Sequence, residues 1–577
     1  MSNKFADRIS ALRDMMRESG WDAVLVSGSD PHSSEYPAPR WKQVEWLSGF
    51  TGEAGDLVIT QNHVGLWTDT RYFIQARRQL EGTGIELHKT RIPEQVLIPE
   101  WLAHFAFGEK NIINIAIDGL CQRVSDIEEI KSSFDDDKEV RIVSVPDMLD
   151  SIWTDRPAIP DTRIIDLDDS ITGESCDDKV DWLRAFLREK GCDAMLISSL
   201  DEIAWILNIR ANDIDYNPLA ISYLIISQDE VRWFVRENYD DVYISLAEGF
   251  GRLFVDPGTL NFHLFSILDK NNILTGPSPI KLRKAVKNSV EIEGMKKIHI
   301  EDGLAMEKFL FWLDSSIKNG EKITEWDAAR KLGEYRAEIP GYAGDSFETI
   351  SAYGPGAALP HYITPRENAP VIEKGGLYLC DSGGQYTNGT TDITRTVPTG
   401  PCSFLEMEDY TLVLKGHIEL AMAVFPKGTA GCQIDYAARS PLWQAMRNFG
   451  HGTGHGVGFY LGVHEGPQDI RQNFNRQPIL PGMITSDEPG IYREGMHGIR
   501  HENLILCTEA GHNEFGEWLK FETITLCHFD TGAIIRNLLS DAEIRWLNNY
   551  NETVYKTLSP RLPDDVSKWL REKTKAI

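Results

Sequence analysis

A segment near the start of the chain recurs 171 residues later, from Asp7 to Asp178, and this repeat constrains the fold more than any other feature. Residues 7–30 read DRISALRDMMRESGWDAVLVSGSD, and residues 178–201 read DKVDWLRAFLREKGCDAMLISSLD. Each copy has apolar residues at helical spacing, then a glycine suited to a helix C-cap, then a short apolar run typical of a buried strand. The sequence therefore predicts two related α/β domains in tandem.

Changes in composition along the chain indicate where further domains begin. Residues 153–163 (WTDRPAIPDTR) are rich in proline and charge, and residues 274–295 lead into a new amphipathic helix. Beyond them, glycine-rich turns alternate with strand-like runs, and a helical tail follows from about Ser540. At roughly 100–200 residues per domain, a chain of 577 residues has room for three or four domains. We expect three, at 1–158, 159–288 and 289–577.

Charge and cysteine usage narrow the class of function. Lys and Arg number 59 against 87 Asp and Glu, a net charge of −28, which repels phosphate backbones and argues against nucleic acid as a partner. No stretch approaches the ~20 apolar residues of a membrane span, and the first residues lack the apolar core of a secretory signal. The eight cysteines include no C-x-x-C pair, so we expect reduced thiols and a cytoplasmic location without membrane attachment.

The first chemically suggestive segment of the third domain is GLYLCDSGGQYTNGTTDITRTV (376–397). Two alternating runs flank a Gly/Asn turn, which predicts a β-hairpin. Asp381 and Asp392 would lie near facing positions of its two arms and could share a cation. Taken alone, the pattern fits ordinary aspartate turn chemistry equally well.

The next segment is FGHGTGHGVGFYLGVHEGP (449–467). His451 and His455 are four residues apart, as in zinc-protease helices, but the intervening glycines disfavour a helix. Glycines instead allow the backbone to pass close to a site and to present His455 without crowding it. Two histidines in a glycine-rich loop without any ligand remain the alternative.

Two later segments contribute one glutamate each, Glu488 in SDEPGIY (486–492) and Glu502 in GIRHENLIL (498–506). With the two aspartates and His455, they make four carboxylates and one imidazole. Four carboxylates in one cavity cannot all stay ionised without cations, because like charges raise one another's pKa. Two divalent metals would supply the missing charge, and an oxygen-rich ligand set suits Mn²⁺ or Co²⁺ better than a structural zinc site. A metal pair about 3.5–4 Å apart can hold a bridging hydroxide and polarise a carbonyl, as hydrolases require.

In order and spacing, these segments resemble the pita-bread metallopeptidases, whose ligands come in the order Asp, Asp, His, Glu, Glu. The resemblance is closest to the aminopeptidase P (Xaa-Pro aminopeptidase) family in its long, three-domain cytoplasmic form, and it covers nearly the whole chain. GDLVITQNHVGLWTDTRYFIQA (55–76) and SLDEIAWILNIRANDIDYNP (199–218) are similar to the first and second domains of that form. DSGGQYTNGTTDITRT, HGTGHGVG, VHEGP, DEPGIY and GIRHEN are similar to its catalytic segments. The implied fold is two creatinase-like α/β domains followed by an α+β pita-bread domain with a helical C-terminal tail.

The resemblance also implies which side chains bind the metals. Asp392 and Glu502 would bridge the two ions, and Glu488 would in addition move a proton from the attacking water towards the departing amine. His455 would bind one metal only. The full implied ligand set is Asp381, Asp392, His455, Glu488 and Glu502.

Four other residues match substrate-contacting positions of the family. His361, in LPHYI, would stabilise the tetrahedral intermediate, and His464, in GVHEGP, would contact the substrate near the scissile bond. His451 would lie in the pocket for the proline ring. Arg71, in WTDTRYF, would reach the peptide from the first domain, with a buried ion pair to Asp69 or another acid as the alternative.

Two positions depart from the family pattern. His501 precedes Glu502 where an aliphatic residue is usual, and alternation along a strand should turn its side chain to the opposite face, so we do not expect a ligand there. Cys380 replaces an aliphatic residue before Asp381 and can act as a small apolar substitute.

The predicted function is hydrolysis of the bond between an N-terminal residue and a following proline, with two divalent metals, manganese first and cobalt or zinc as alternatives. The partners would be peptides with proline in second position, and the resemblance implies a homodimer. A prolidase-type X-Pro dipeptidase is the nearest alternative, although prolidases usually have one N-terminal domain. A non-catalytic pita-bread binding protein and a creatinase-type C–N hydrolase are disfavoured, because all five ligand positions are intact.

Overall fold

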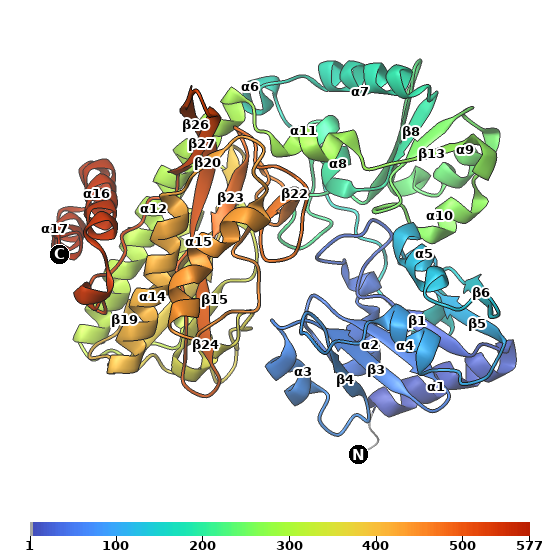
Figure 1. The fold of residues 1–577 in the computed structure, drawn as a ribbon, viewed down its shortest axis with the longest axis horizontal. Coiled ribbons are helices and arrows are strands. Elements are labelled where there is room, and N and C mark those ends of the chain that lie inside the picture. The colour runs from blue at the N-terminus through green and yellow to red at the C-terminus, as the bar shows by residue number, and fades with distance from the viewer. Residues whose placement is uncertain (1–3) are drawn as a thin grey trace. The chain divides into compact units, whose positions relative to one another are not determined.

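The computed structural model describes residues 4–577, which form two compact units (Figure 1). The first unit contains residues up to Leu167 together with Glu174–Ile280, and the second contains Asp168–Gly173 with Lys281–Ile577. No helix within residues 4–577 is both long and apolar enough to cross a membrane.

The first unit begins with a six-stranded sheet in the order β4-β3-β2-β1-β5-β6. Its central strand β1 pairs antiparallel with β2 and parallel with β5. The strands are β1 (Ala23–Val26), β2 (Asp56–Thr60), β3 (Val64–Thr68), β4 (Glu86–Lys89), β5 (Ile112–Ile117) and β6 (Glu139–Ser144). The helices are α1 (Lys4–Ser19), α2 (Gln43–Ser48), α3 (Phe73–Gln79), α4 (Ile98–His104) and α5 (Val124–Ser132).

A five-stranded sheet in the order β11-β10-β8-β12-β13 follows in the same unit. Its strands are β8 (Ala194–Ile197), β10 (Ser222–Ser227), β11 (Val231–Val235), β12 (Leu253–Val255) and β13 (Ile273–Thr275). Its helices are α7 (Cys176–Lys190), α8 (Leu200–Ile206), α9 (Asp241–Glu248) and α10 (Phe262–Ile267). A short pair, β7 (Ile165–Asp166) with β9 (Ile209–Arg210), completes this unit. Helix α11 (Pro279–Ala285) spans the sequence boundary between the two units.

The repeat predicted from the sequence is present in both sheets. Helix α1 leads through Gly20 into β1, and helix α7 leads through Gly191 into β8; both glycines have a positive φ, of 70° and 64°. Strand β8 pairs antiparallel with β10 and parallel with β12, as β1 does with β2 and β5. The expected pair of related α/β folds is therefore confirmed, while the domain limits 1–158, 159–288 and 289–577 stay predictions.

The second unit combines helices with three main sheets. Strands β15 (Ile350–Tyr353), β16 (Leu377–Ser382) and β19 (Ile393–Pro398) form one sheet, and β14 (Tyr342–Asp345), β17 (Gly384–Tyr386) and β18 (Gly389–Thr390) form another. The six-stranded sheet contains β20 (Val424–Pro426), β27 (Gly516–Thr523), β26 (Asn503–Asn513), β23 (Ile484–Asp487), β21 (Gly454–Gly456) and β22 (Glu465–Ile470), in that order. Strands β24 (Gly490–Arg493) and β25 (His497–Arg500) form a separate ribbon.

Helices pack against these sheets, and two further helices form the C-terminal end of the chain (Figure 1). They are α6 (Asp169–Thr172), α12 (Ser289–Lys318), α13 (Glu325–Ala337), α14 (Phe404–Ala421), α15 (Gly431–Gln444), α16 (Asp541–Leu558) and α17 (Asp564–Lys573). The main core of the unit joins α14 to the C-terminal helices, through residues such as Val413, Leu547 and Leu558. Ser540 caps α16, so the helical tail begins where the sequence predicts it.

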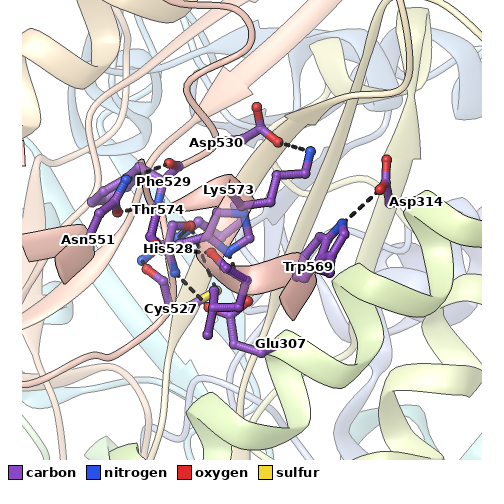
Figure 2. Close-up of polar contacts among 12 residues, drawn as sticks. Glu307, Asp314, Cys527, His528, Phe529, Asp530, Asn551, Trp569, Lys573 and Thr574 are labelled. Carbon is purple, nitrogen blue, oxygen red and sulfur yellow. Dashed lines mark hydrogen bonds and ion pairs between the residues drawn. The ribbon is translucent and has the colours of Figure 1, made fainter. Parts of the chain in front are cut away.

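Polar contacts attach this tail to the rest of the unit (Figure 2). Trp569 Nε1 of α17 donates to Asp314 Oδ2 of α12 at 2.8 Å. Just before the tail, Glu307 of α12 accepts hydrogen bonds from both the backbone N and Nδ1 of His528, each at 2.8 Å. Because Asp314 and Glu307 both belong to α12, this long helix holds the C-terminal tail and the segment around His528 that precedes it.

Helices α12 and α13 are joined by a buried ion pair that allows a test of the packing. Arg336 Nε and Nη2 donate to the two carboxylate oxygens of Asp302 at 2.8 and 3.2 Å, and Tyr386 Oη donates to Asp302 at 2.6 Å. Asp302→Ala should lower the free energy of unfolding by about 3–5 kcal/mol, because it leaves a buried guanidinium without a counter-charge. Thermal and urea unfolding of the full chain measures the loss. The double variant Asp302→Leu, Arg336→Met should recover most of it; an equal loss in both variants would contradict the electrostatic origin.

Candidate metal centre

The hairpin predicted over 376–397 brings two aspartates to one side of a sheet. Strands β16 and β19 pair antiparallel with Asp381 opposite Thr394. Asp392 lies two residues before Thr394, and side chains two apart share a face of an extended strand, so both carboxylates point the same way. Asp381 and Asp392 are 7% and 3% exposed.

The six-stranded sheet supplies the other three predicted ligands from adjacent strands. His455 lies in β21, Glu488 directly follows β23, and Glu502 directly precedes β26. Strand β23 pairs with both β21 and β26, which places these three positions side by side. The glycines around His455 are required by this packing: a Cβ on Gly454 would lie 2.0 Å from the carbonyl oxygen of Ser486.

The structure brings all five side chains predicted as metal ligands into one cluster. His455 Nε2 lies 3.5 Å from Asp392 Oδ2 and 3.3 Å from Glu488 Oε1. One ligand atom each of Asp381, Asp392 and Glu502 lie within 4.8 Å of one another, and so do those of His455, Glu488 and Glu502. Among residues 4–577, the buried atoms Asp381 Oδ1 and Glu502 Oε1 find no hydrogen-bond partner. Unpaired buried carboxylate oxygens in such a cluster fit a cation-binding centre.

The pKa shifts of the clustered carboxyl groups also indicate a cation-binding centre. Burial raises the pKa of Asp381 and of Glu488, and Asp392 adds repulsion to both carboxyls. Burial raises the pKa of Glu502 well above its usual value, and repulsion from Asp392, Glu488 and Asp381 adds to that effect. The donor set therefore carries more negative charge than the protein alone stabilises, which is the condition that divalent cations relieve.

Neighbouring groups orient the ligands. His455 Nδ1 donates to its neighbour's carbonyl oxygen, Gly456 O, at 3.0 Å, which leaves Nε2 directed at the carboxylates. Thr394 Oγ1 donates to Glu502 Oε2 at 2.8 Å, and Ser486 Oγ donates to Glu488 Oε1 at 3.2 Å. The hydroxyls satisfy one oxygen of each glutamate and fix its direction.

Arg500 and Tyr492 contact the predicted site residues Asp381 and His451, and the sequence analysis did not identify them. Arg500 is 3% exposed; its Nη2 is bonded to Asp381 Oδ2, and its Nη1 donates to Tyr492 Oη at 2.7 Å. Tyr492 Oη is in turn 2.7 Å from His451 Nε2. Both residues lie inside segments already singled out, GIRHEN and DEPGIY, but nothing local in the sequence identifies their partners.

The predicted substrate residues of this unit lie around the cluster. The His464 ring packs edge-on against the His455 ring, with centroids 4.3 Å apart, and His464 offers a ligand atom close to those of Asp392 and His455. Burial lowers the pKa of His451 well below its usual value, with Arg500, and to a lesser extent the nearby His361, adding to the effect. Its Nδ1 bonds to Gly452 O at 2.7 Å, so Nε2 accepts from Tyr492.

The two residues that depart from the family pattern lie in the core. The His501 ring packs edge-on against Tyr410 and Phe529, at centroid distances of 4.5 and 5.6 Å, and Cys380 is fully buried among apolar side chains. His501 therefore occupies a packing position beside the cluster.

Arg71 belongs to the first unit, where the ion pair weighed as its alternative is present. Its Nε and Nη2 donate to the two oxygens of Asp69 at 2.9 and 2.7 Å. Although burial opposes it, the Arg71 guanidinium lowers the pKa of Asp69 to about 2. A role of Arg71 towards the peptide stays a prediction.

Comparison with family models of known proteins matches most of the chain. Residues 293–509 match the model of metallopeptidase family M24, and residues 517–577 match the C-terminal region of that peptidase. Residues 8–152 and 155–248 match models of the creatinase/prolidase N-terminal domain.

Full-length relatives agree with these matches. The chain is 35% identical to a probable Xaa-Pro aminopeptidase P of Coprinopsis cinerea, covering 99% of this chain and 98% of the relative. It is 34% identical to aminopeptidase P1 of Arabidopsis thaliana, covering 99% of both. The crystal structure of an X-prolyl aminopeptidase from Caenorhabditis elegans, described as a cytosolic enzyme with a di-nuclear active site, superimposes with a TM-score of 0.94 at 33% identity over 100% of both chains. The chain therefore belongs to metallopeptidase family M24, within its aminopeptidase P group.

Proposed function

We propose that this chain is a metal-dependent aminopeptidase that releases the N-terminal residue from peptides whose second residue is proline. The observation that carries the proposal is the convergence of His455 and four carboxylates, three of them buried and that of Glu488 half-buried, in one cluster. Full-length similarity to proteins named Xaa-Pro aminopeptidase supports the choice of substrate.

The proposed ligands of two divalent cations are Asp381, Asp392, His455, Glu488 and Glu502, with Asp392 and Glu502 shared between the ions. Four carboxylates and one imidazole favour Mn²⁺, with Co²⁺ or Zn²⁺ as alternatives. When bound, the two cations would supply Lewis-acid chemistry, activating water and polarising the scissile carbonyl.

Glu488 is the proposed proton carrier. Its carboxylate is held by Ser486 Oγ and lies 3.3 Å from His455 Nε2, and burial raises its pKa, which suits a group that must both accept and release a proton. Glu488 takes a proton from the attacking water and delivers it to the departing proline nitrogen, which must be protonated to leave.

Three histidines and Arg71 are the proposed substrate contacts. The nitrogen of an X-Pro bond carries no hydrogen, so the enzyme must bind the proline ring and cannot accept a hydrogen bond from the substrate backbone there. His451, held neutral between Tyr492 and Gly452, would line the proline-ring pocket. His361 would stabilise the tetrahedral intermediate, and His464 would contact the substrate near the scissile bond. Arg71 would reach the peptide.

The remaining proposals concern assembly and location. We propose a homodimer in the cytoplasm. Among residues 4–577 no two of the eight cysteines form a disulfide, and the Caenorhabditis elegans relative is described as cytosolic.

Glu502→Gln should reduce bound metal from about two ions per chain to one or none, because a neutral amide replaces a shared charged ligand. Elemental analysis after dialysis against Mn²⁺ measures the ratio. Glu522→Gln, a partly exposed glutamate of β27 paired with Lys296, is the matched control and should keep both ions. Two ions retained by the Glu502 variant would exclude it as a bridging ligand.

Glu488→Gln should lower turnover of Arg-Pro-Pro by about a thousandfold, since the amide cannot carry a proton. Chromatographic release of arginine gives the rate, and circular dichroism checks that the variant folds. Glu509→Gln, on the exposed end of β26, should behave as wild type. Wild-type turnover in the Glu488 variant would refute its role.

The choice of peptide separates the proposal from prolidase. An aminopeptidase of this type should cleave Arg-Pro-Pro with a higher kcat/KM than the dipeptide Arg-Pro, because a residue beyond proline adds binding energy. Steady-state kinetics on both peptides, with and without a chelator, measures the ratio. Activity on Arg-Pro alone would favour the dipeptidase alternative.

A further inference from the structure

A second group of side chains that could hold a metal ion lies in the first unit, beside strand β4. Strand β4 is one edge of the six-stranded sheet of that unit (Figure 1). His63 is in the turn that joins β2 to β3, and Glu86 and His88 are on the edge strand β4. Strands β3 and β4 run parallel with Gly65 opposite Glu86 and Trp67 opposite His88. Because residues two apart on a strand share a face, Glu86 and His88 point to the same side as Gly65 and Trp67.

The distance between the two imidazole nitrogens in this group matches that around a single zinc ion: His63 Nε2 and His88 Nε2 are 3.2 Å apart. Glu86 Oε2 lies 3.7 Å from the other ring nitrogen of His63, Nδ1. One ligand atom from each of the three residues lies within 4.8 Å of the other two. Two imidazole nitrogens bound to the same tetrahedral Zn²⁺ at 2.0–2.1 Å are separated by roughly 3.3 Å.

The surroundings hold both imidazole rings in this arrangement. Trp67 stacks on His88 with centroids 3.8 Å apart and an interplanar angle of 6°, and Trp101 of α4 lies over His63 at 4.6 Å. A Cβ on Gly65 would lie 2.6 Å from His63 Nε2 and 2.7 Å from His88 Cδ2, so only glycine leaves room for the pair.

The charge state of the group also suits a metal. Burial lowers the pKa of both His63 and His88, which favours the neutral imidazole that binds metals at pH 7. Arg13 adds to this effect on His63, while Glu86 opposes it on both rings. The Glu86 side chain is 66% exposed and can supply a negatively charged ligand from the solvent side.

We propose that His63, His88 and Glu86 form a surface Zn²⁺ site, with the fourth coordination position open to water. Two imidazoles and one carboxylate are a common zinc ligand set, whereas Mn²⁺ and Mg²⁺ prefer oxygen ligands. A bound ion joins the β2–β3 turn to the edge strand β4. It therefore stabilises the first sheet by favouring the folded state over the unfolded one.

The test is zinc stoichiometry of the full chain after equilibrium dialysis against micromolar Zn²⁺. The wild type should bind about one more Zn²⁺ per chain than the double variant His63→Gln, His88→Gln. Turnover of Arg-Pro-Pro by Mn²⁺-loaded protein should be equal in both, because the variant leaves the M24 cluster untouched. His104→Gln, an exposed histidine at the end of α4, is the matched control and should bind as much zinc as the wild type.

Two further measurements test the zinc site even if the double variant folds poorly. Glu86→Gln changes a mostly exposed side chain and should weaken the extra zinc site about tenfold or more while the metal-free melting temperature stays unchanged. In the wild type, X-ray absorption at the zinc edge should detect a site with two imidazole ligands besides the M24 centre. Equal zinc content in all variants, or no loss of affinity in Glu86→Gln, would overturn the proposal.

Discussion

Mutual repulsion among four clustered carboxylates is the constraint on which the second unit depends. Burial raises the pKa of Asp381, Glu488 and Glu502, and for Glu502 the neighbouring carboxylates raise it further. Within residues 4–577, the guanidinium of Arg500 is a compensating cation in direct contact with the cluster, bonded to Asp381. One guanidinium cannot balance four carboxylates, so the metal-free cluster carries an electrostatic cost that cation binding removes.

Backbone contacts hold the ligands in place against this repulsion. Arg395 is 1% exposed, and its guanidinium donates to the carbonyl oxygens of Thr394, Glu502 and Cys527. It thereby ties β19 to the start of β26 and to the segment that α12 and the C-terminal tail hold (Figure 2). The helical tail, which carries no predicted ligand, contributes to the centre by fixing the backbone of Glu502 through this one side chain.

The parts of the fold that follow from local sequence were predictable. The αβ repeat depends on helical spacing, a C-cap glycine and a short apolar strand, and the hairpin carrying Asp381 depends on its turn; all are within one segment. The five clustered ligands could be named because their segments, in order and spacing, together resemble those of a known family, although no single segment identifies a ligand. The pair of Arg500 with Asp381 joins positions 119 residues apart. His63 and His88 meet only because β3 and β4 run parallel after an intervening helix, and no local pattern specifies such a pairing.

The two clusters in this chain differ in the chemistry of their donors, and that difference bears on how metals distribute between them. The M24 cluster offers four carboxylates and one imidazole, a set suited to hard ions, while the site at β4 offers two imidazoles and one exposed carboxylate. Zn²⁺ binds nitrogen and oxygen donors more tightly than Mn²⁺ in general, so the protein's affinities alone do not keep zinc out of the M24 cluster. Occupancy there must follow the supply of each metal. The imidazole pair at the sheet edge, by contrast, favours Zn²⁺ over Mn²⁺ because two of its donors are nitrogen atoms. Mn²⁺ at ordinary concentrations therefore does not displace zinc from this site.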